Sequence, residues 1–161
     1  MRAFALLRTA VYMGCFVALW AWAVVAVRRW DAAIGVALPG WLAAVGYLAM
    51  VCGAVLALLC GASFAARGRG TPAPFDPPAE LVASGPYGHV RNPMYLAAVA
   101  LLAGYGLVVG SAAVLLLAAA GLSLAHLFVV FVEEPGLERR FGESYLAYRR
   151  SVNRWLPRRP R

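Results

Sequence analysis

Charged residues divide this chain into long apolar stretches separated by short polar segments. Between Asn92 and Val132 there is no Asp, Glu, Lys or Arg over forty-one residues. As a single helix this stretch would be about 60 Å long, twice the ~30 Å thickness of the hydrocarbon layer of a bilayer. We therefore predict that it folds back as a helical hairpin that turns at Gly110-Ser111. The two polar ends of the hairpin then meet at one face of the membrane.

Two further uncharged stretches predict two more membrane helices. Thr9–Val27 is long enough for one crossing, and its length and aromatic residues argue against a cleaved signal peptide. Pro39-Gly40 interrupts the second stretch and leaves Trp41–Ala66 as a long, tilted helix. Together with the hairpin, these helices predict an all-α integral membrane protein with four transmembrane helices.

The composition agrees with this fold class. A chain of 161 residues that is 63% hydrophobic and 14% charged is too apolar for a soluble domain of that size. All three cysteines fall inside the predicted spans, without the spacing of metal ligands or of a disulfide framework. We therefore expect no metal site and assign the cysteines to packing.

The net charge of +8 comes entirely from arginine. With four spans, thirteen of the fifteen arginines fall on one side of the membrane and two on the other. This distribution predicts that both termini and the open end of the hairpin are cytoplasmic. The partner that it indicates is the lipid bilayer, not nucleic acid.

The chain is predicted to have three parts. Residues 1–66 form two N-terminal transmembrane helices, residues 67–93 form a cytoplasmic loop rich in Pro and Gly, and residues 94–161 form the hairpin and a C-terminal interfacial amphipathic helix. Gly142 is expected to weaken this last helix. Its apolar face can lie against lipid headgroups or against the hairpin mouth, and a simple membrane anchor is a third possibility. The apolar face comprises Leu137, Phe141, Tyr145, Tyr148, Val152 and Trp155.

The carboxylates of Glu133 and Glu134 mark one end of the hairpin. Neighbouring residues on a helix point about 100° apart, so these two side chains cannot both point the same way. Negative charge at a helix C-terminus opposes the helix dipole, and a cation would offset that cost. The cation can be an arginine of the tail or a positively charged ligand. The alternative is that both carboxylates are solvated charges at a helix end.

The other end of the hairpin carries a second polar cluster. Asn92 is placed as the N-cap and Pro93 in the first turn, and the free N–H groups beside Arg91 are a suitable anion site. A capped helix explains Asn92 and Pro93, but it does not explain the neighbouring His89 and Tyr95.

His126 is an isolated polar residue inside the hairpin. It lies two turns before Glu133. It is either functional or hydrogen-bonded across the helices to a backbone or hydroxyl group.

Three blocks of sequence occur in a familiar order along the second half of the chain. The blocks G-P-Y-x-x-V-R-N-P-M-Y, E-E-P-x-L and F-G-x-x-Y-x-x-Y-x-x-x-V-x-R-W-x-P fall between Leu81 and Pro157. In this order they resemble the isoprenylcysteine carboxyl methyltransferase family, whose broader relatives include phospholipid methyltransferases. Asn92 stands where eukaryotic members usually have His, as in bacterial relatives, and the methyl acceptor is left open.

The resemblance implies an S-adenosylmethionine-dependent methyltransferase of a bacterial inner membrane, acting on a lipophilic or small acceptor. The cofactor would bind at the cytoplasmic end of the last spans. Arg91 and Arg154 would orient carboxylate groups, and His89 would act as a base if the acceptor needs one. The cofactor-binding residues that the resemblance implies are His89, Arg91, Asn92, Pro93, Tyr95, Glu133, Glu134, Tyr145, Tyr148 and Arg149.

Two other functions remain open at this point. Sterol reductases, which use NADPH, have a similar C-terminal architecture, and a non-catalytic membrane subunit would bind neither cofactor. The oligomeric state is also open.

Overall fold

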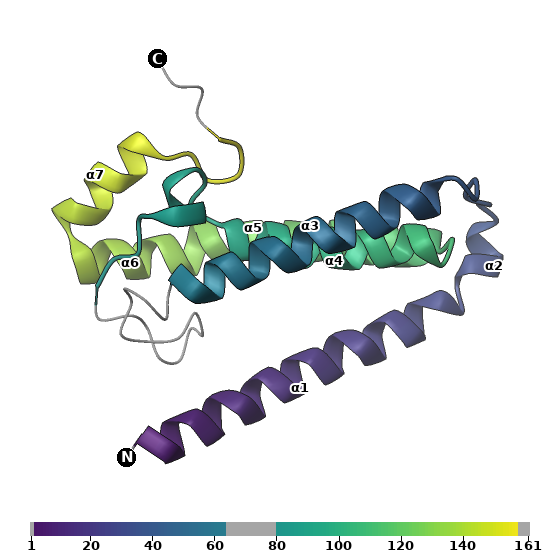
Figure 1. Cartoon of the computed structure of the whole chain (residues 1–161), viewed down its shortest axis with the longest axis horizontal. Helices are drawn as coiled ribbons and strands as arrows, with labels where there is room; N and C mark the ends of the chain where they lie inside the picture. The colour runs from purple at the N-terminus through teal and green to yellow at the C-terminus, as the bar shows by residue number, and fades with distance from the viewer. Residues whose placement is uncertain (1, 64–79, 158–161) are drawn as a thin grey trace.

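The computed structural model describes residues 2–63 and 80–157, and within these residues it is helical, without a strand. Residues 67–79 of the predicted loop lie outside this part of the chain. Figure 1 shows the helices Leu42–Ser63 (α3), Pro93–Val108 (α4) and Ala112–Phe128 (α5) side by side along one axis, with α7 (Glu143–Ser151) at one end of the molecule and α2 (Asp31–Ile34) at the other. The elements are α1 (Arg2–Arg28), α2 (Asp31–Ile34), α3 (Leu42–Ser63), η2 (Gly85–Gly88), α4 (Pro93–Val108), α5 (Ala112–Phe128), η3 (Val129–Glu133), α6 (Glu134–Phe141) and α7 (Glu143–Ser151).

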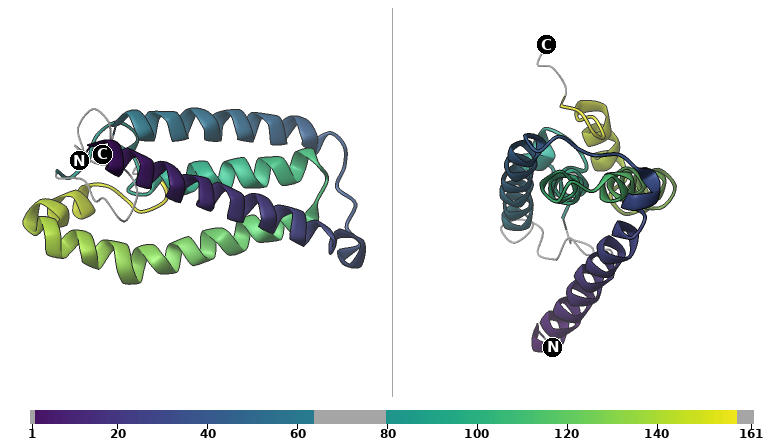
Figure 2. Two further views of the ribbon diagram at one scale, coloured as in Figure 1. Left: turned by 90° about the horizontal axis from the view of Figure 1, so that it is seen from below. Right: turned by 90° about the vertical axis from the view of Figure 1, so that its right-hand side faces the viewer.

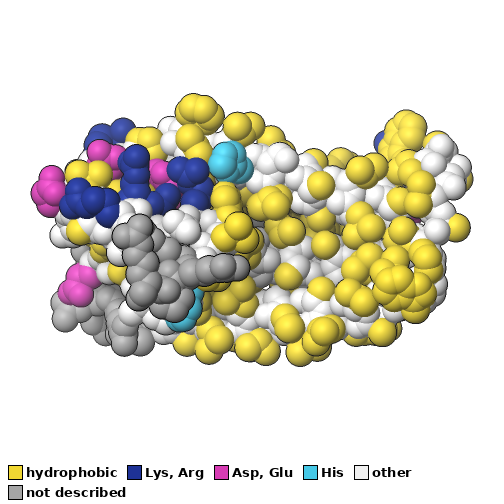
Figure 3. Space-filling model, turned by 90° about the horizontal axis from the view of Figure 1, so that it is seen from above, with side chains coloured by type: hydrophobic (Ala, Val, Ile, Leu, Met, Phe, Trp, Pro, Cys, Tyr) yellow, Lys and Arg dark blue, Asp and Glu magenta, His cyan; other side chains and the backbone are white. Residues whose placement is uncertain are grey.

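Two helices of the described part are long and apolar enough to cross a membrane: α3, and the continuous helix Ala112–Phe141 that begins as α5. The apolar helices Val17–Arg28 and Pro93–Val108 are shorter. Figure 3 shows charged side chains gathered mainly at one end of a surface that is otherwise largely apolar. Large apolar side chains such as Leu58 and Phe131 are exposed, as is common for helices that face lipid.

The hairpin predicted between Asn92 and Val132 is confirmed, and it turns at the expected residues. α4 ends at Val108, and Gly110 adopts a φ of +65°, which a residue without a Cβ reaches at little cost. Ser111 then caps α5 by accepting a hydrogen bond of 3.2 Å from the backbone N–H of Val114.

Small residues allow α3 and α4 to approach closely. A Cβ at Gly104 would lie 2.7 Å from the carbonyl oxygen of Gly46, and one at Gly46 would lie 2.6 Å from the carbonyl oxygen of Gly104. Farther along the same contact, a Cβ at Gly53 would lie 2.9 Å from the carbonyl oxygen of Ala97. The two backbones therefore touch, as in other membrane helix pairs with small residues at the interface.

α1 is packed differently from the other long helices. It contacts α5 near α2 and diverges from the bundle toward its N-terminal end (Figure 2). The turn after it is fixed to the hairpin, because an oxygen of the Asp31 carboxylate accepts a 2.9 Å hydrogen bond from the N–H of Ala113. A hydrogen bond from the Ser111 side chain and this backbone bond hold the pKa of Asp31 below its usual value.

The predicted C-terminal amphipathic helix is broken into two. Gly142, with a φ of +51°, separates α6 from α7, which ends at Ser151. Most of the predicted apolar face packs together instead of facing lipid, and Leu81 covers it. Of the three positions left open by the sequence, the structure therefore favours packing against the hairpin mouth. We call α6 and α7 together the cap. The packed residues are Leu137, Phe141, Tyr145, Tyr148 and Val152.

Candidate active site

A π-helical turn orients the two carboxylates at the end of the hairpin. Val129–Glu133 forms this turn between α5 and α6, and its wider hydrogen-bond ring changes the direction of the side chains that follow. Glu133 and Glu134 point in different directions, as expected, and they have different partners. Glu133 accepts a hydrogen bond of 2.9 Å from the hydroxyl of Tyr95 on α4.

Glu134 is the centre of a buried network with two arginines. Its Oε1 lies 2.7 Å from Arg91 Nη2 and 2.7 Å from Arg154 Nε, while its Oε2 lies 2.9 Å from Arg154 Nη2. The side chains of Arg91 and Glu134 are 9% and 8% exposed. The hydrogen bonds to Glu134 raise the pKa of Arg154. Two guanidinium groups around one carboxylate leave the network with a net positive charge.

The segment after α7 is fastened to the start of α4 by its backbone. The N–H of Arg91 donates to the carbonyl of Asn153 at 2.9 Å, and Arg91 Nη1 donates to the carbonyl of Arg149 at 3.1 Å. The guanidinium of Arg149 points away and pairs with Glu138 at the surface.

Asn92 also binds this C-terminal segment. It occupies the N-cap position of α4 and Pro93 lies in the first turn, both as predicted, but the Asn92 side chain makes no capping hydrogen bond. Its buried amide instead donates to the carbonyl of Arg154 at 3.3 Å. The Asn92 side chain therefore binds the C-terminal segment and not the free N–H groups at the start of α4.

A chain of aromatic side chains, Tyr95, Trp155 and His126, adjoins the two carboxylates. The rings of Tyr95 and Trp155 meet edge to face at 6.3 Å, and Trp155 Nε1 donates to Nδ1 of His126 at 3.0 Å. His126 thus pairs with an indole, not with the backbone or hydroxyl group considered from the sequence. The sequence placed Trp155 on the apolar face of a helix, and this polar contact was missed because α7 ends before it.

Tyr145 and Tyr148 are the buried residues of α7. The Tyr148 hydroxyl donates to the carbonyl of Tyr87 at 2.6 Å, and the Tyr145 side chain is 1% exposed. Burial raises the pKa of Tyr145 to about 12. The hydrogen bond of Tyr148 holds α7 on the η2 turn, and Tyr145 packs against Tyr148.

His89 is placed apart from the other predicted site residues. It is exposed, and its Nδ1 lies 3.1 Å from the carbonyl oxygen of Gly85 in its own turn. Within the part of the chain that the structure describes, its hydrogen bond does not join it to Glu133 or Glu134.

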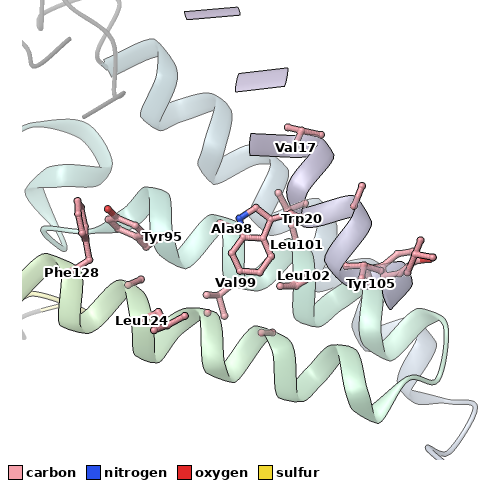
Figure 4. Close-up of a pocket in the computed structure, with 16 residues that line it drawn as sticks. Val17, Trp20, Tyr95, Ala98, Val99, Leu101, Leu102, Tyr105, Leu124 and Phe128 are labelled. Carbon is pink, nitrogen blue, oxygen red and sulfur yellow. The ribbon is translucent and has the colours of Figure 1, made fainter. Parts of the chain in front are cut away.

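An apolar cavity of about 830 Å³ opens from this site along the helices. It lies between α1, α4 and α5, with Tyr95 and Phe128 near one end and Tyr105 near the other (Figure 4). Because Tyr95 also binds Glu133, the cavity and the polar site share a residue.

The sequence profile of the phospholipid methyltransferase family matches residues 41–144. This range includes α3, the whole hairpin and both carboxylates, and it covers well over half of the chain. A comparison with curated proteins found no match. The profile agrees with the resemblance seen in the sequence blocks, and the chain belongs to the phospholipid methyltransferase family.

Proposed function

We propose that this protein transfers a methyl group from S-adenosylmethionine to a lipophilic acceptor that enters from the bilayer. The observation that carries the proposal is the junction at Tyr95, where a polar site with charged residues of both signs meets an apolar cavity. A charged, water-soluble donor suits the polar site, and an apolar acceptor suits the cavity. Membership of a methyltransferase family supports the reaction type.

The residues present fit such a donor. Arg91 Nε is buried without a hydrogen-bond partner among the described residues, and the network around Glu134 carries excess positive charge. Both features suit the donor's carboxylate. Glu133 suits its amino group or its ribose hydroxyls. When bound, the donor supplies an electrophilic methyl group.

The protein's own part in this reaction is to position groups and to exclude water. Methyl transfer by direct displacement needs the acceptor atom aligned with the methyl group in a dry site. The C-terminal segment, held by Arg91, Asn92 and Glu134, covers the hairpin mouth and would serve this purpose. In this arrangement Arg91 and Arg154 would orient the donor and take no part in breaking or forming bonds. The contacts of His89 give no support for a general base there.

The membrane arrangement that we propose follows the arginine distribution. α1, α3, α4 and α5 would cross the bilayer, with the hairpin mouth on the cytoplasmic side where the donor is found. The apolar cavity would then lie at the depth of the acyl chains. An acceptor would reach Tyr95 from the bilayer without crossing water.

Binding of the two cofactors to the purified, full-length protein tests the proposal. We expect saturable binding of radiolabelled S-adenosylmethionine and none of NADPH. Glu133→Gln should weaken the binding, whereas Glu143→Gln, whose side chain is 86% exposed on the cap, should not. Saturable binding of NADPH alone would favour a reductase, and binding of neither would favour a non-catalytic subunit. Either result defeats the proposal.

A further inference from the structure

The side chain of Trp20 crosses the apolar cavity from α1 to α5. A Cβ at Gly121 would lie 2.9 Å from Trp20 Cη2 and 3.6 Å from Cζ3, so the edge of the indole touches the backbone of α5. Only glycine leaves room for this contact. Figure 4 shows the ring between the Tyr95 end and the Tyr105 end of the cavity.

The position of this ring divides the cavity along its length. Gly121 lies seven residues before Phe128, which corresponds to about 10 Å along the helix. The part between Phe128 and Trp20 is the inner compartment, and it includes Tyr95, Val99 and Leu124. Its polar end is the Tyr95 hydroxyl, which donates to Glu133.

The walls of the inner compartment fit a hydrocarbon chain. Apart from the tips of the tyrosines and the indole, the side chains that line the cavity are apolar. The whole volume of about 830 Å³ lies within the ~300–1,000 Å³ usual for small-molecule sites. Because the cavity is continuous with Tyr95, a chain lying in it would have its head at the polar site.

We propose that Trp20, through its contact with Gly121, limits the length of the acceptor's hydrocarbon chain. This inference rests on the proposed function and names a residue that determines acceptor specificity. A chain that ends before the indole is accommodated as the cavity stands. A longer chain must displace a ring packed against a helix backbone, which overpacks the contact and weakens binding about tenfold.

Competition between straight-chain alcohols tests this limit without any methyl donor. The full-length protein in lipid nanodiscs is labelled with octanol that carries a photoactivatable diazirine. The label on Tyr95 and Val99, which line the inner compartment and are only partly exposed, is measured by mass spectrometry. Alcohols from hexanol to octadecanol then compete at equal mole fraction in the bilayer. We expect competition by the short alcohols and about tenfold weaker competition beyond a certain length.

Substitutions on α1 distinguish the effect of the Trp20 ring on the length limit from the effect of other residues of this helix. Trp20→Ala should move the limit to longer alcohols, and Trp20→Phe, which keeps an aromatic ring of shorter reach, should move it less. Trp22→Ala is the matched control, because Trp22 is 67% exposed and does not line the cavity. It should leave the limit unchanged.

Two results would overturn the inference. One is the same length limit in the unaltered protein, Trp20→Phe and Trp20→Ala. The other is equal labelling of Leu116, which is 61% exposed on α5 outside the cavity, because this would mean that the probe reports only bulk lipid. Neither result depends on S-adenosylmethionine, so a failure of the proposed function appears separately, as a lack of donor binding.

Discussion

Arg154, after the last helix, binds both carboxylate oxygens of Glu134 at the end of the hairpin, with distances of 2.7 and 2.9 Å. Arg91 binds the same carboxylate from the start of α4. Three segments that are distant in the sequence therefore meet at one buried charge. The hydrogen bonds to Glu134 hold the C-terminal segment against the hairpin mouth, where this segment covers the candidate site.

Removing the central carboxylate should destabilise the protein strongly. Glu134→Ala leaves two guanidinium groups facing each other, one of them buried, and breaking a buried ion pair costs ~3–5 kcal/mol. The measurement is thermal unfolding in detergent. Arg150→Ala is the control, because Arg150 and Glu143 are 70% and 86% exposed and 3.9 Å apart, and such a pair contributes ~0–1 kcal/mol. Equal losses in both variants would contradict the buried network.

Donor binding should depend on groups from both ends of the hairpin. Glu133→Ala and Arg91→Ala should each weaken the binding of S-adenosylmethionine by at least ~1.5 kcal/mol, a typical loss for a hydrogen bond to a charged group. Equilibrium binding of the labelled donor to the purified protein measures this. Unaltered affinity in both variants, with folding intact, would remove these residues from the donor site.

The hairpin and the polar ends that it brings together were predictable from the sequence. A run of apolar residues twice the length of a span has to turn, and Gly110 was suited to the turn. The partners of individual side chains were less predictable. The π-turn before Glu134 leaves no compositional signal, and the use of the Asn92 amide by the tail depends on a tertiary contact that helix-capping rules do not include.

The contact between α3 and α4 should not tolerate even one added methyl group. In Gly104→Ala, the new Cβ would lie 2.7 Å from the carbonyl oxygen of Gly46, so the helices must separate, and overpacking of this kind costs ~1–3 kcal/mol. Gly61→Ala on α3 is the control, since a Cβ there meets no atom within 4 Å. It should leave stability unchanged or raise it by up to ~1 kcal/mol, the helix propensity of alanine over glycine. Unfolding temperatures of both variants decide the matter.

Cysteine labelling tests the predicted orientation. A labelling site on the outer face must be exposed and must not have a structural role. Ser111, at the hairpin turn, is buried and caps α5, whereas Gly40, between α2 and α3, is exposed. In a background without Cys15, Cys52 and Cys60, Gly40→Cys should react with an impermeant maleimide from outside intact cells. Ser144→Cys, on the cap, should react only after the membrane is opened. Labelling of both from the same side would refute the arrangement of spans.

The capping of α5 by Asp31 predicts how stability depends on pH. The hydrogen bonds from Ser111 and from the N–H of Ala113 lower the pKa of this carboxyl in the folded protein below its ordinary value of 3.8. The carboxylate therefore contributes its full stabilisation above pH 3.8, and this contribution is lost as the pH falls toward and through the lowered pKa. Asp31→Asn should lower the unfolding temperature by a constant amount at neutral and mildly acidic pH, and the difference from the unaltered protein should shrink below pH 3.8. Asp31→Ser, which can still cap a helix but carries no charge, should show the same loss of pH dependence. A difference that grows on acidification would mean that the carboxylate is destabilised in the fold and that the proposed cap is wrong.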